Sequence, residues 1–522
     1  MFLDKPSASH FDCLPEESID HMKNLELYVP TRVQGSRREF SCAILGAGPA
    51  GMGFLFHAFK SGKLDEIARK GLLIIDKRSW LGSGKLGDYA NVVGNSVGKT
   101  FLACLEHETL ETLFDDIRTF SPLHRCMVAA GDGAPQLRDA GDLLALAAER
   151  LIAHLVAHYD VTVLRGYEVD TLQRRTEGGF DIVYRDVADP KGVPMTVSSE
   201  TVVMNFGGMQ QTDEIDSLCG GLDLAAPGAD VQRFTSDELL SCNTAQLVGT
   251  FAPIFARLAE AGQSGRPKRV TVLGGSHSAF SVVDRVATEL GCIGVDEIAV
   301  VHRSAIRLFF ETAELAREQG YVIDEANDIC PVTKRVNRSS GLRYRAFDVA
   351  RSIMSTGHVP GMKPPVELIE VGSGEAARTR AEACLADSIA VVHGAGYGPN
   401  LPALNDHRGL PIPLQFGQGG LVSDACGQPF DVHGDLVPGL FSFGLGSGFR
   451  PDPQIGSEAA FRGRIYGVWI FHHDIGGKVL KGVLDVLASG ASGHAPGAAA
   501  DAPPAANDAV APAAAPMSQM TA

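Results

Sequence analysis

The sequence has no apolar run long enough to cross a membrane and no closely spaced pair of cysteines. A membrane helix needs roughly 20 consecutive apolar residues, and no segment of the 522 residues approaches that length. The ten cysteines are scattered without a Cys-x-x-Cys pair, which disfavours a structural zinc site, a disulfide framework and a dithiol redox centre. Residues Met1–Pro6 lack the basic stretch and apolar run of a signal peptide. We therefore expect a cytoplasmic protein without a metal site, with mostly reduced and buried cysteines.

An excess of positive charge is absent as well. The formal net charge of -16 disfavours a nucleic-acid or anionic-membrane surface, so we expect small molecules as partners and leave a homo-oligomer open. Hydrophobic residues make up 45% of the chain, which is ordinary for a soluble enzyme. A chain of 522 residues exceeds what one hydrophobic core usually serves, which predicts two domains.

The stretch Phe40–Asp76 has the order of elements found in dinucleotide-binding domains. Apolar residues at Cys42–Leu45 predict a strand, which leads into Gly46-Ala47-Gly48-Pro49-Ala50-Gly51 and a helix to about Lys60. A second buried strand is expected at Leu72–Ile75 and ends on Asp76. A glycine-rich turn without a ligand is the alternative, but the complete order of elements favours a dinucleotide site.

Each glycine of this turn has a physical role. Gly46 permits the tight strand-to-helix turn, Gly48 lets the backbone approach a pyrophosphate, and Gly51 lets helix and strand pack closely. The helix N-terminus presents unpaired N–H groups to the phosphates. Asp76 is placed to accept hydrogen bonds from ribose hydroxyls.

A second unit of the same kind begins near residue 270. The apolar run Val270–Leu273 precedes Gly274-Gly275-Ser276-His277-Ser278-Ala279, a helix from about Ser278 to Leu290 and a strand at Ile298–Val301. Arg303, followed by Ser304, stands where the first unit has its aspartate. A cation there suits the 2′-phosphate of NADP; an ordinary α/β unit with a surface arginine is the alternative.

Further elements follow from periodicity and composition. A helix is expected at Asp142–Ala157 and another at Glu458–Leu480. The remaining strands are expected at Val161–Leu164, Phe180–Tyr184, Thr201–Met204 and Ser388–Val392.

Residues 325–351 interrupt the second unit and are basic. The stretch contains Lys334, Arg335, Arg338, Arg343, Arg345 and Arg351. A solvated face is the usual explanation of such a run. The sharper alternative is a site for an anionic group, because paired arginines can hold a carboxylate through two hydrogen bonds.

The motifs together, from about residue 40 to 480, resemble the two-dinucleotide-binding-domain flavoproteins. Within that group the chain is similar to the class B flavin monooxygenases, which include the FMO, Baeyer–Villiger and amine N-hydroxylating families. The resemblance rests on both turns, on the strand Val161–Val169, and on the strand ends Val203–Gly208 and Val392–Tyr397. The histidine fingerprint of FMO and Baeyer–Villiger enzymes is absent, because Phe234–Leu240 occupies its place without a histidine. Ketone oxygenation is therefore not favoured.

This resemblance implies an α/β fold in which an FAD-binding Rossmann-like domain carries an inserted NADPH-binding Rossmann-like domain. It implies transfer of one oxygen atom from a flavin hydroperoxide to nitrogen, or another soft atom, of a small polar or anionic substrate such as an amino acid or amine. FAD and NADPH are the implied cofactors, oxygen is the co-substrate, and no catalytic side chain is singled out. His277 is interpreted as a packing or hydrogen-bonding residue of the second turn.

Three sets of binding residues are expected. For FAD they are Gly46, Gly48, Pro49, Ala50, Gly51, Asp76, Lys77, Val169, Gly207 and Gly446. For NADPH they are Gly274, Gly275, Ser276, His277, Ser278, Ala279, Arg303, Ser304 and Gly396. For the substrate they are Lys99, Arg343 and Arg345, and the glycine-rich loop Gly82–Gly98 is expected to run along the flavin toward them.

Five segments are expected along the chain. They are an extension at 1–39, the FAD-binding domain at 40–235 and 387–485, the NADPH-binding domain with the basic insert at 236–386, and a disordered Ala/Pro-rich tail at 486–522. The alternative function is an NAD(P)H–flavin oxidoreductase without oxygen insertion. A non-catalytic nucleotide sensor and an oxidase using FAD alone are disfavoured, because neither needs the second nucleotide unit.

Overall fold

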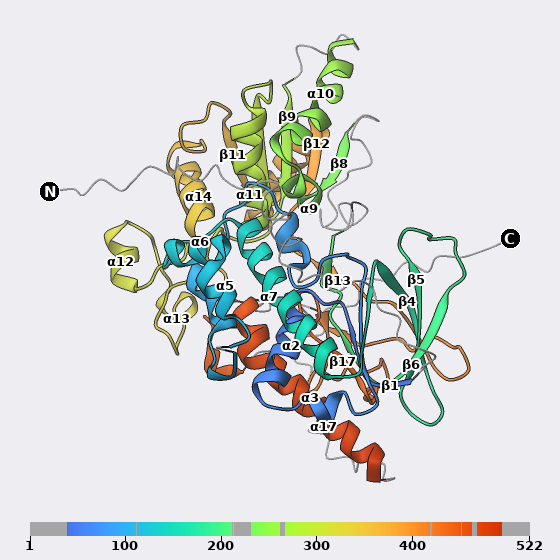
Figure 1. Ribbon diagram of the computed structural model, residues 1–522. Coiled ribbons are helices and arrows are strands. Elements are labelled where there is room, and N and C mark those ends of the chain that lie inside the picture. Colours follow the sequence, from blue (N-terminus) through green and yellow to red (C-terminus); the bar gives the residue numbers. More distant parts are fainter. Residues whose placement is uncertain are drawn as a thin grey trace.

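The computed structural model describes residues 39–492 except 111, 211, 213–230, 261–266, 418–419, 450–451 and 462–466. Residues 1–38 and 493–522, most of the predicted extension and tail, lie outside this part of the chain. The described residues form two α/β domains, one above the other in the view of Figure 1. The predicted fold, one Rossmann-like domain inserted into another, is confirmed.

The first domain is built on one mixed sheet. Its strands are β1 (Glu39–Leu45), β2 (Leu72–Asp76), β3 (Val161–Arg165), β4 (Tyr167–Arg174), β5 (Phe180–Asp186), β6 (Met195–Met204), β14 (Ala403–Asn405) and β17 (Leu440–Ser442). The strands β3, β2, β1 and β6 run parallel in that spatial order. Apolar residues fill the middle of β1 and β2 on both faces, as expected for parallel strands that are covered on both sides.

Strand β6 belongs to two parts of this sheet. Its first half pairs antiparallel with β5, which pairs antiparallel with β4 in turn. Its last residues, Val202–Met204, pair parallel with Leu440–Ser442 of β17. The chain therefore returns from far along the sequence to place β17 beside the end of β6, close to the first turn.

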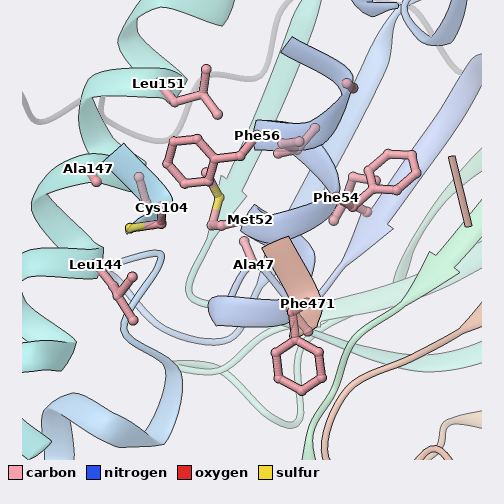
Figure 2. Close-up of a cluster of buried hydrophobic side chains, with 14 of the residues drawn as sticks. Ala47, Met52, Phe54, Phe56, Cys104, Leu144, Ala147, Leu151 and Phe471 are labelled. Carbon is pink, nitrogen blue, oxygen red and sulfur yellow. The ribbon is translucent and has the colours of Figure 1, made fainter. Parts of the chain in front are cut away.

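Helices cover one face of the first sheet. They are α2 (Pro49–Lys60), α3 (Leu64–Ile67), α4 (Gly98–Leu102), α5 (Asp115–Phe120), α6 (Pro122–Ala130), α7 (Leu137–His158), α16 (Val468–Ile470), a π-helical turn at Phe471–Ile475 and α17 (Gly476–Ser492). Figure 2 shows Met52 and Phe56 of α2 on the side of α7, whereas Phe54 points to the opposite side of α2; all three belong to one buried cluster. Proline at the first position of α2 is compatible with the helix, because its missing N–H would have no partner there.

The second domain has a parallel sheet of its own. Its strands, in spatial order, are β11 (Val366–Glu370), β10 (Glu297–His302), β9 (Arg269–Leu273), β12 (Ser388–His393) and β8 (Gln232–Thr235). Its helices are α9 (Ser236–Ser241), α10 (Thr244–Glu260), α11 (His277–Arg285), a π-helical turn at Val286–Leu290, α12 (Ala313–Glu318), α13 (Glu325–Asp328), α14 (Tyr344–Thr356) and α15 (Glu375–Ala386).

Two short strands join the domains. The outgoing link contains β7 (Gly208–Met209) and the returning link contains β13 (Gly398–Pro399), and the two pair antiparallel. The second sheet includes β8 and β12, so it extends past both expected boundaries, at 235/236 and at 386/387.

The C-terminal region differs from the prediction. Its described helix begins at Val468 rather than Glu458 and continues through α17 to Ser492. The apolar side chains of Val479, Leu480, Val483 and Leu487 are buried in the first core, which carries the helix past residue 486, where a disordered tail was predicted. No helix in the described segments is long and apolar enough to span a membrane.

Candidate functional site

The first turn requires glycine at two of its three glycine positions for steric reasons. Gly46 has a φ of +87°, and a methyl group added to it would lie 2.5 Å from the carbonyl oxygen of Asn205. A methyl group added to Gly51 would lie 2.2 Å from the carbonyl oxygen of Gly46. The strand, the turn and α2 can therefore pack in this way only without side chains at these positions.

At the third position, Gly48, the backbone faces another glycine. A methyl group on Gly48 would lie 3.4 Å from the Cα atom of Gly84, and Gly84 in turn approaches the ring of Pro49. The glycine-rich loop that follows β2 therefore lies against the turn. Ala50 is buried in the first helical turn. This cradle of backbone and small side chains fits a pyrophosphate group.

Asp76 is held at the end of β2 by the turn itself. Its carboxylate accepts hydrogen bonds from the backbone N–H of Ala47 at 2.7 Å and of Arg78 at 2.8 Å. Burial raises the pKa of Asp76, while the two backbone donors and the charges of Arg78 and Lys77 act in the opposite direction. Lys77 itself is exposed, and its ammonium lies 3.4 Å from the carboxylate of Glu168. The acid is thus fixed next to the turn, where a ribose hydroxyl would approach.

The carboxyl ends of β6 and β17 form a shallow hollow beside this turn. Its lining includes Phe206, Gly207, Leu401, Phe443, Gly446 and Ser447. Asn205 connects the two strand ends, since its side-chain amide donates to the Phe443 carbonyl at 2.9 Å. The predicted Gly207 and Gly446 therefore lie together although 239 positions separate them in the chain.

Val169 lies on β4, near the segment that follows Asp76. It is buried and pairs with Tyr184 across the β4–β5 ladder. The start of β4 is tied to the first unit because Gly166 donates its N–H to the Arg78 carbonyl at 3.3 Å. The expected contact of Val169 with FAD stays a prediction.

The second turn also depends on glycine, but partly on a glycine from another strand. Gly274 has a φ of +123°, and a methyl group there would lie 2.4 Å from the Gly394 carbonyl oxygen. Ala279 stands where the first turn has its third glycine. A methyl group on Gly394 would lie 3.1 Å from the Cα and Cβ atoms of Ala279. The space that a glycine would provide in the helix is thus provided by the returning link.

Arg303 and Ser304 follow β10 directly and are exposed. A methyl group on Gly275 would lie 3.4 Å from Cβ of His302, the last residue of β10. His302 donates from Nδ1 to the Ser304 carbonyl at 2.9 Å and so shapes this strand end. Within the described residues, no ion pair engages the Arg303 guanidinium.

His277 forms a hydrogen bond and is not placed to act as a base. Its Nε2 atom accepts the backbone N–H of Arg343 at 3.1 Å. Burial, and then the charge of Arg343, lower the pKa of His277 to about 4, so the ring is neutral at pH 7. The neighbouring Ser278 hydroxyl is hydrogen-bonded to Tyr397 of the returning link.

The three predicted substrate residues have different surroundings. Lys99 forms an exposed ion pair with Asp132 at 2.9 Å. Arg345 holds Asp284 of α11 through two hydrogen bonds of 2.7 and 2.6 Å, so its guanidinium is engaged within the second domain. Arg343 is half-buried, with its guanidinium 3.9 Å from the centre of the Phe309 ring.

A polar cluster at the domain junction was not predicted. The Asp237 carboxylate accepts hydrogen bonds from the hydroxyls of Tyr89 at 2.7 Å and Tyr397 at 2.6 Å, and it pairs with the Lys85 ammonium. Lys85 also donates to the Gly208 carbonyl at 3.2 Å. Burial is the main cause of the raised pKa of both tyrosines. We call these four residues (Lys85, Tyr89, Asp237 and Tyr397) the junction cluster.

The junction cluster joins every element that connects the two turns. Lys85 and Tyr89 belong to the first-domain loop, Tyr397 to the returning link, and Asp237 to the first turn of α9. Gln210 of the outgoing link adds to it, because its amide donates to the Gly396 carbonyl at 2.9 Å and accepts from Ser236 at 3.0 Å. Polar residues in a glycine-rich loop were the only sequence signal for this cluster.

Comparison with known proteins adds a relative that matches nearly the whole chain. No family model matches the sequence. The CMP-5'-(3-aminopropyl)phosphonate hydroxylase of Streptomyces rubellomurinus is 29% identical over 449 residues, which covers 85% of this chain and 97% of that protein. That protein is a hydroxylase by name. The resemblance to hydroxylating flavoproteins inferred from the motifs agrees with this relative.

Solved structures similar to this chain include three hydroxylating enzymes. The ornithine hydroxylase PvdA of Pseudomonas aeruginosa is 12% identical, with 86% of this chain and 100% of that chain covered and a TM-score of 0.49. The ornithine N-hydroxylase KtzI of Kutzneria sp. 744, with reduced FAD, NADP+ and L-ornithine, is 13% identical, with 85% and 99% covered and a TM-score of 0.48. The FAD-bound cadaverine monooxygenase DfoA of Erwinia amylovora is 11% identical, with 92% and 99% covered and a TM-score of 0.47.

Proposed function

We propose that the chain is an FAD- and NADPH-dependent monooxygenase that hydroxylates the nitrogen of a small polar amine. The observation that carries this proposal is the pair of glycine-containing turns, each at the carboxyl end of parallel strands in its own sheet, whose connecting links pair with each other. Two such sites at one junction suit hydride transfer from one cofactor to the other. FAD, once reduced by NADPH, supplies the oxygen-activating chemistry.

In this proposal the first turn binds FAD. Gly46–Gly51 and the N-terminus of α2 hold the pyrophosphate, and Asp76 accepts from the ribose. Lys77 and Val169 lie at the adenosine end, while Gly207 and Gly446 line the hollow at the carboxyl ends of β6 and β17. The steric limits at Gly46 and Gly51 support this assignment, because they keep the turn free of side chains.

The second turn binds NADPH. Gly274–Ala279 and the N-terminus of α11 hold its pyrophosphate, and Arg303 with Ser304 receives the 2′-phosphate. Gly396 lies on the returning link, where the nicotinamide end would reach the first domain. The neutral His277 keeps this turn in place through its hydrogen bond to the Arg343 backbone.

Nitrogen is the proposed site of oxygen transfer. The similar hydroxylase is named for a substrate that carries an aminopropyl group and a phosphonate, which matches a small polar amine with an anionic end. Lys99 and Arg343 are the cations that we assign to the substrate side. Their part is to orient the substrate by charge, since no proton-transfer residue is assigned.

The proposal is tested with the purified, FAD-loaded protein. Flavin absorbance is followed by rapid mixing, first with NADPH in the absence of oxygen and then with oxygenated buffer, and products are identified by mass spectrometry. We expect a delayed return of the oxidised spectrum and a hydroxylated amine. Full recovery of the electrons as hydrogen peroxide with every amine supplied would favour the alternative, an NAD(P)H–flavin oxidoreductase without oxygen insertion.

The NADPH assignment is tested by Arg303→Ala. The Michaelis constant for NADPH should rise by about tenfold or more, the value of one lost charge-assisted contact, while the constant for NADH changes little. Arg257→Ala, at an exposed arginine of α10, is the matched control. Equal effects on NADPH and NADH would remove Arg303 from the 2′-phosphate site.

A further inference from the structure

The arginines of the basic insert fall into two groups. Arg345 is neutralised by Asp284, and Arg335 by Glu311 at 2.7 Å. Arg351 is exposed and donates to the Gln319 side chain. Arg338 donates to the Gly456 carbonyl. Within the described residues only Arg335 and Arg345 of the insert arginines have a carboxylate partner, so the fold neutralises part of the charge of the insert.

Arg343 belongs to the group without a carboxylate partner. Its guanidinium lies over the Phe309 ring and donates to the Arg338 carbonyl, and within the described residues no carboxylate lies in ion-pair range of it. Burial is the main cause of its lowered pKa, and the charges of Arg335 and Arg338 act in the same direction. A partly desolvated cation beside two other cations is costly unless an anion joins it.

The backbone holds Arg343 in a fixed position. Its N–H is bound by His277, and the preceding Leu342 donates to the Arg307 carbonyl at 2.8 Å. The next residue, Tyr344, has a φ of +51°, which is unfavourable for a bulky side chain and marks strain. Such strain is typical of sites whose geometry serves a ligand.

The position lies between the two domains. His277 belongs to the second turn. Burial is the main cause of the raised pKa of Tyr344, and the charges of Glu311 and of Asp132, the partner of Lys99 in the first domain, act in the same direction. The insert is also fixed to the C-terminal segment. The buried Glu458 carboxylate accepts the backbone N–H groups of Ser339 and Ser340 at 3.0 and 2.8 Å. The backbone around Arg343 is therefore fixed both to the second turn and to the C-terminal segment.

We propose that Arg343 binds the oxyanion of the substrate, a phosphonate or phosphate separated from the amine by a short carbon chain. A planar guanidinium stacked on an aromatic ring presents its N–H groups in one plane, which matches two oxygens of such a group. The proposal rests on the proposed function for its substrate and names the class: amines that carry a phosphonate or phosphate. The similar hydroxylase, whose named substrate contains both groups, fits this class.

Equilibrium binding tests the proposal without turnover. Isothermal titration of the FAD-loaded, full-length protein is made with CMP-5'-(3-aminopropyl)phosphonate, with 3-aminopropylphosphonate and with propylamine, which lacks the oxyanion. We expect the two phosphonates to bind and propylamine to bind at least about tenfold more weakly, and Arg343→Gln to remove that difference. Arg343→Lys should restore part of it, because charge remains while the planar fork is lost.

Arg351→Gln is the matched control, since Arg351 lies near Phe347, with its guanidinium 6.0 Å from that ring, on the same insert. It should bind all ligands as the unchanged protein does. Absence of phosphonate binding to the unchanged protein, or an equal loss in both glutamine variants, would overturn the proposal. A higher Michaelis constant for NADPH in Arg343→Gln, with unchanged phosphonate binding, would overturn it too and assign the residue to the cofactor. Failure of flavin reduction by NADPH would instead refute the proposed function.

Discussion

The junction cluster offers a direct test of how the two domains are held. We consider the substitution Asp237→Asn, which keeps the size of the side chain and removes its charge. In the intact protein the carboxylate receives two tyrosine hydroxyls at 2.7 and 2.6 Å. The two hydroxyls lie 3.0 Å apart, so without the carboxylate each has mainly the other as its partner.

The expected cost follows from these contacts. A hydrogen bond to a charged group contributes about 1.5–3 kcal/mol and a neutral one about 0.5–1.5 kcal/mol, so the loss of charge at two bonds costs about 2 kcal/mol. The ion pair with Lys85 adds less than about 1 kcal/mol, because the lysine side chain is 43% exposed. We therefore expect Asp237→Asn to destabilise the protein by about 2–3 kcal/mol.

Two measurements check this. Urea unfolding gives the stability, and rapid-mixing absorbance gives the rate of flavin reduction by NADPH, which should fall because the cluster orients one domain on the other. Affinity for FAD should be unchanged, since Asp237 lies outside the first turn. Asp65→Asn is the matched control. Asp65 lies in the first turn of α3, as Asp237 lies in the first turn of α9, but the Asp65 side chain is exposed. If both variants unfold and react alike, the cluster does not hold the domains.

Two further predictions concern buried ionisable side chains in the first domain. Glu149→Gln removes the carboxylate that Arg165 holds through two hydrogen bonds of 2.6 Å, and both side chains are only 1% exposed. We expect the free energy of unfolding, measured in urea, to fall by about 3–5 kcal/mol. The exposed Glu66→Gln should cost less than about 1 kcal/mol, and equal losses in the two variants would contradict the prediction. Burial lowers the pKa of His472 to about 3 in the folded protein, whereas the same histidine in the unfolded chain has a pKa of about 6.5. The unfolded chain therefore takes up the proton first as the pH drops below about 6.5. The free energy of unfolding should fall by about 3 kcal/mol between neutral pH and pH 4. His472→Gln should reduce this pH dependence while the exposed His433→Gln leaves it unchanged; parallel curves for the two variants would refute the assignment.

Local pattern was sufficient to predict both turns. Each consists of a buried strand, a run of small residues and a helix within about 20 consecutive residues, so the order of elements can be recognised in one short segment of the sequence. Where a contact came from a distant segment, the prediction was incomplete. Gly394 supplies the space beside Ala279, and no local reading of Gly274–Ala279 could show this.

The boundaries of the second domain also depend on contacts between distant segments. β12 follows a helix and precedes a glycine-rich link, which is also the pattern of a strand returning to the first domain. Its pairing with β9 and β8 depends on sheet order, which the amino-acid pattern does not encode. The predicted helix start at Glu458 was wrong for a different reason. The Glu458 carboxylate is buried and accepts backbone N–H groups of the insert, and helix propensity does not reveal such a contact.

The two arginines at the start of α14 show why composition alone could not locate a substrate site. Arg343 and Arg345 were both expected to bind the substrate, but residues two apart in a helix project to different sides. Arg345 reaches Asp284 on α11, while Arg343 precedes the helix and lies over Phe309. A run of positive charge therefore consists of cations that the fold has already neutralised and of cations that it has not. The distinction depends on which acidic side chains the neighbouring elements bring near, and here it leaves Arg343, half-buried over the Phe309 ring, without a carboxylate partner among the described residues.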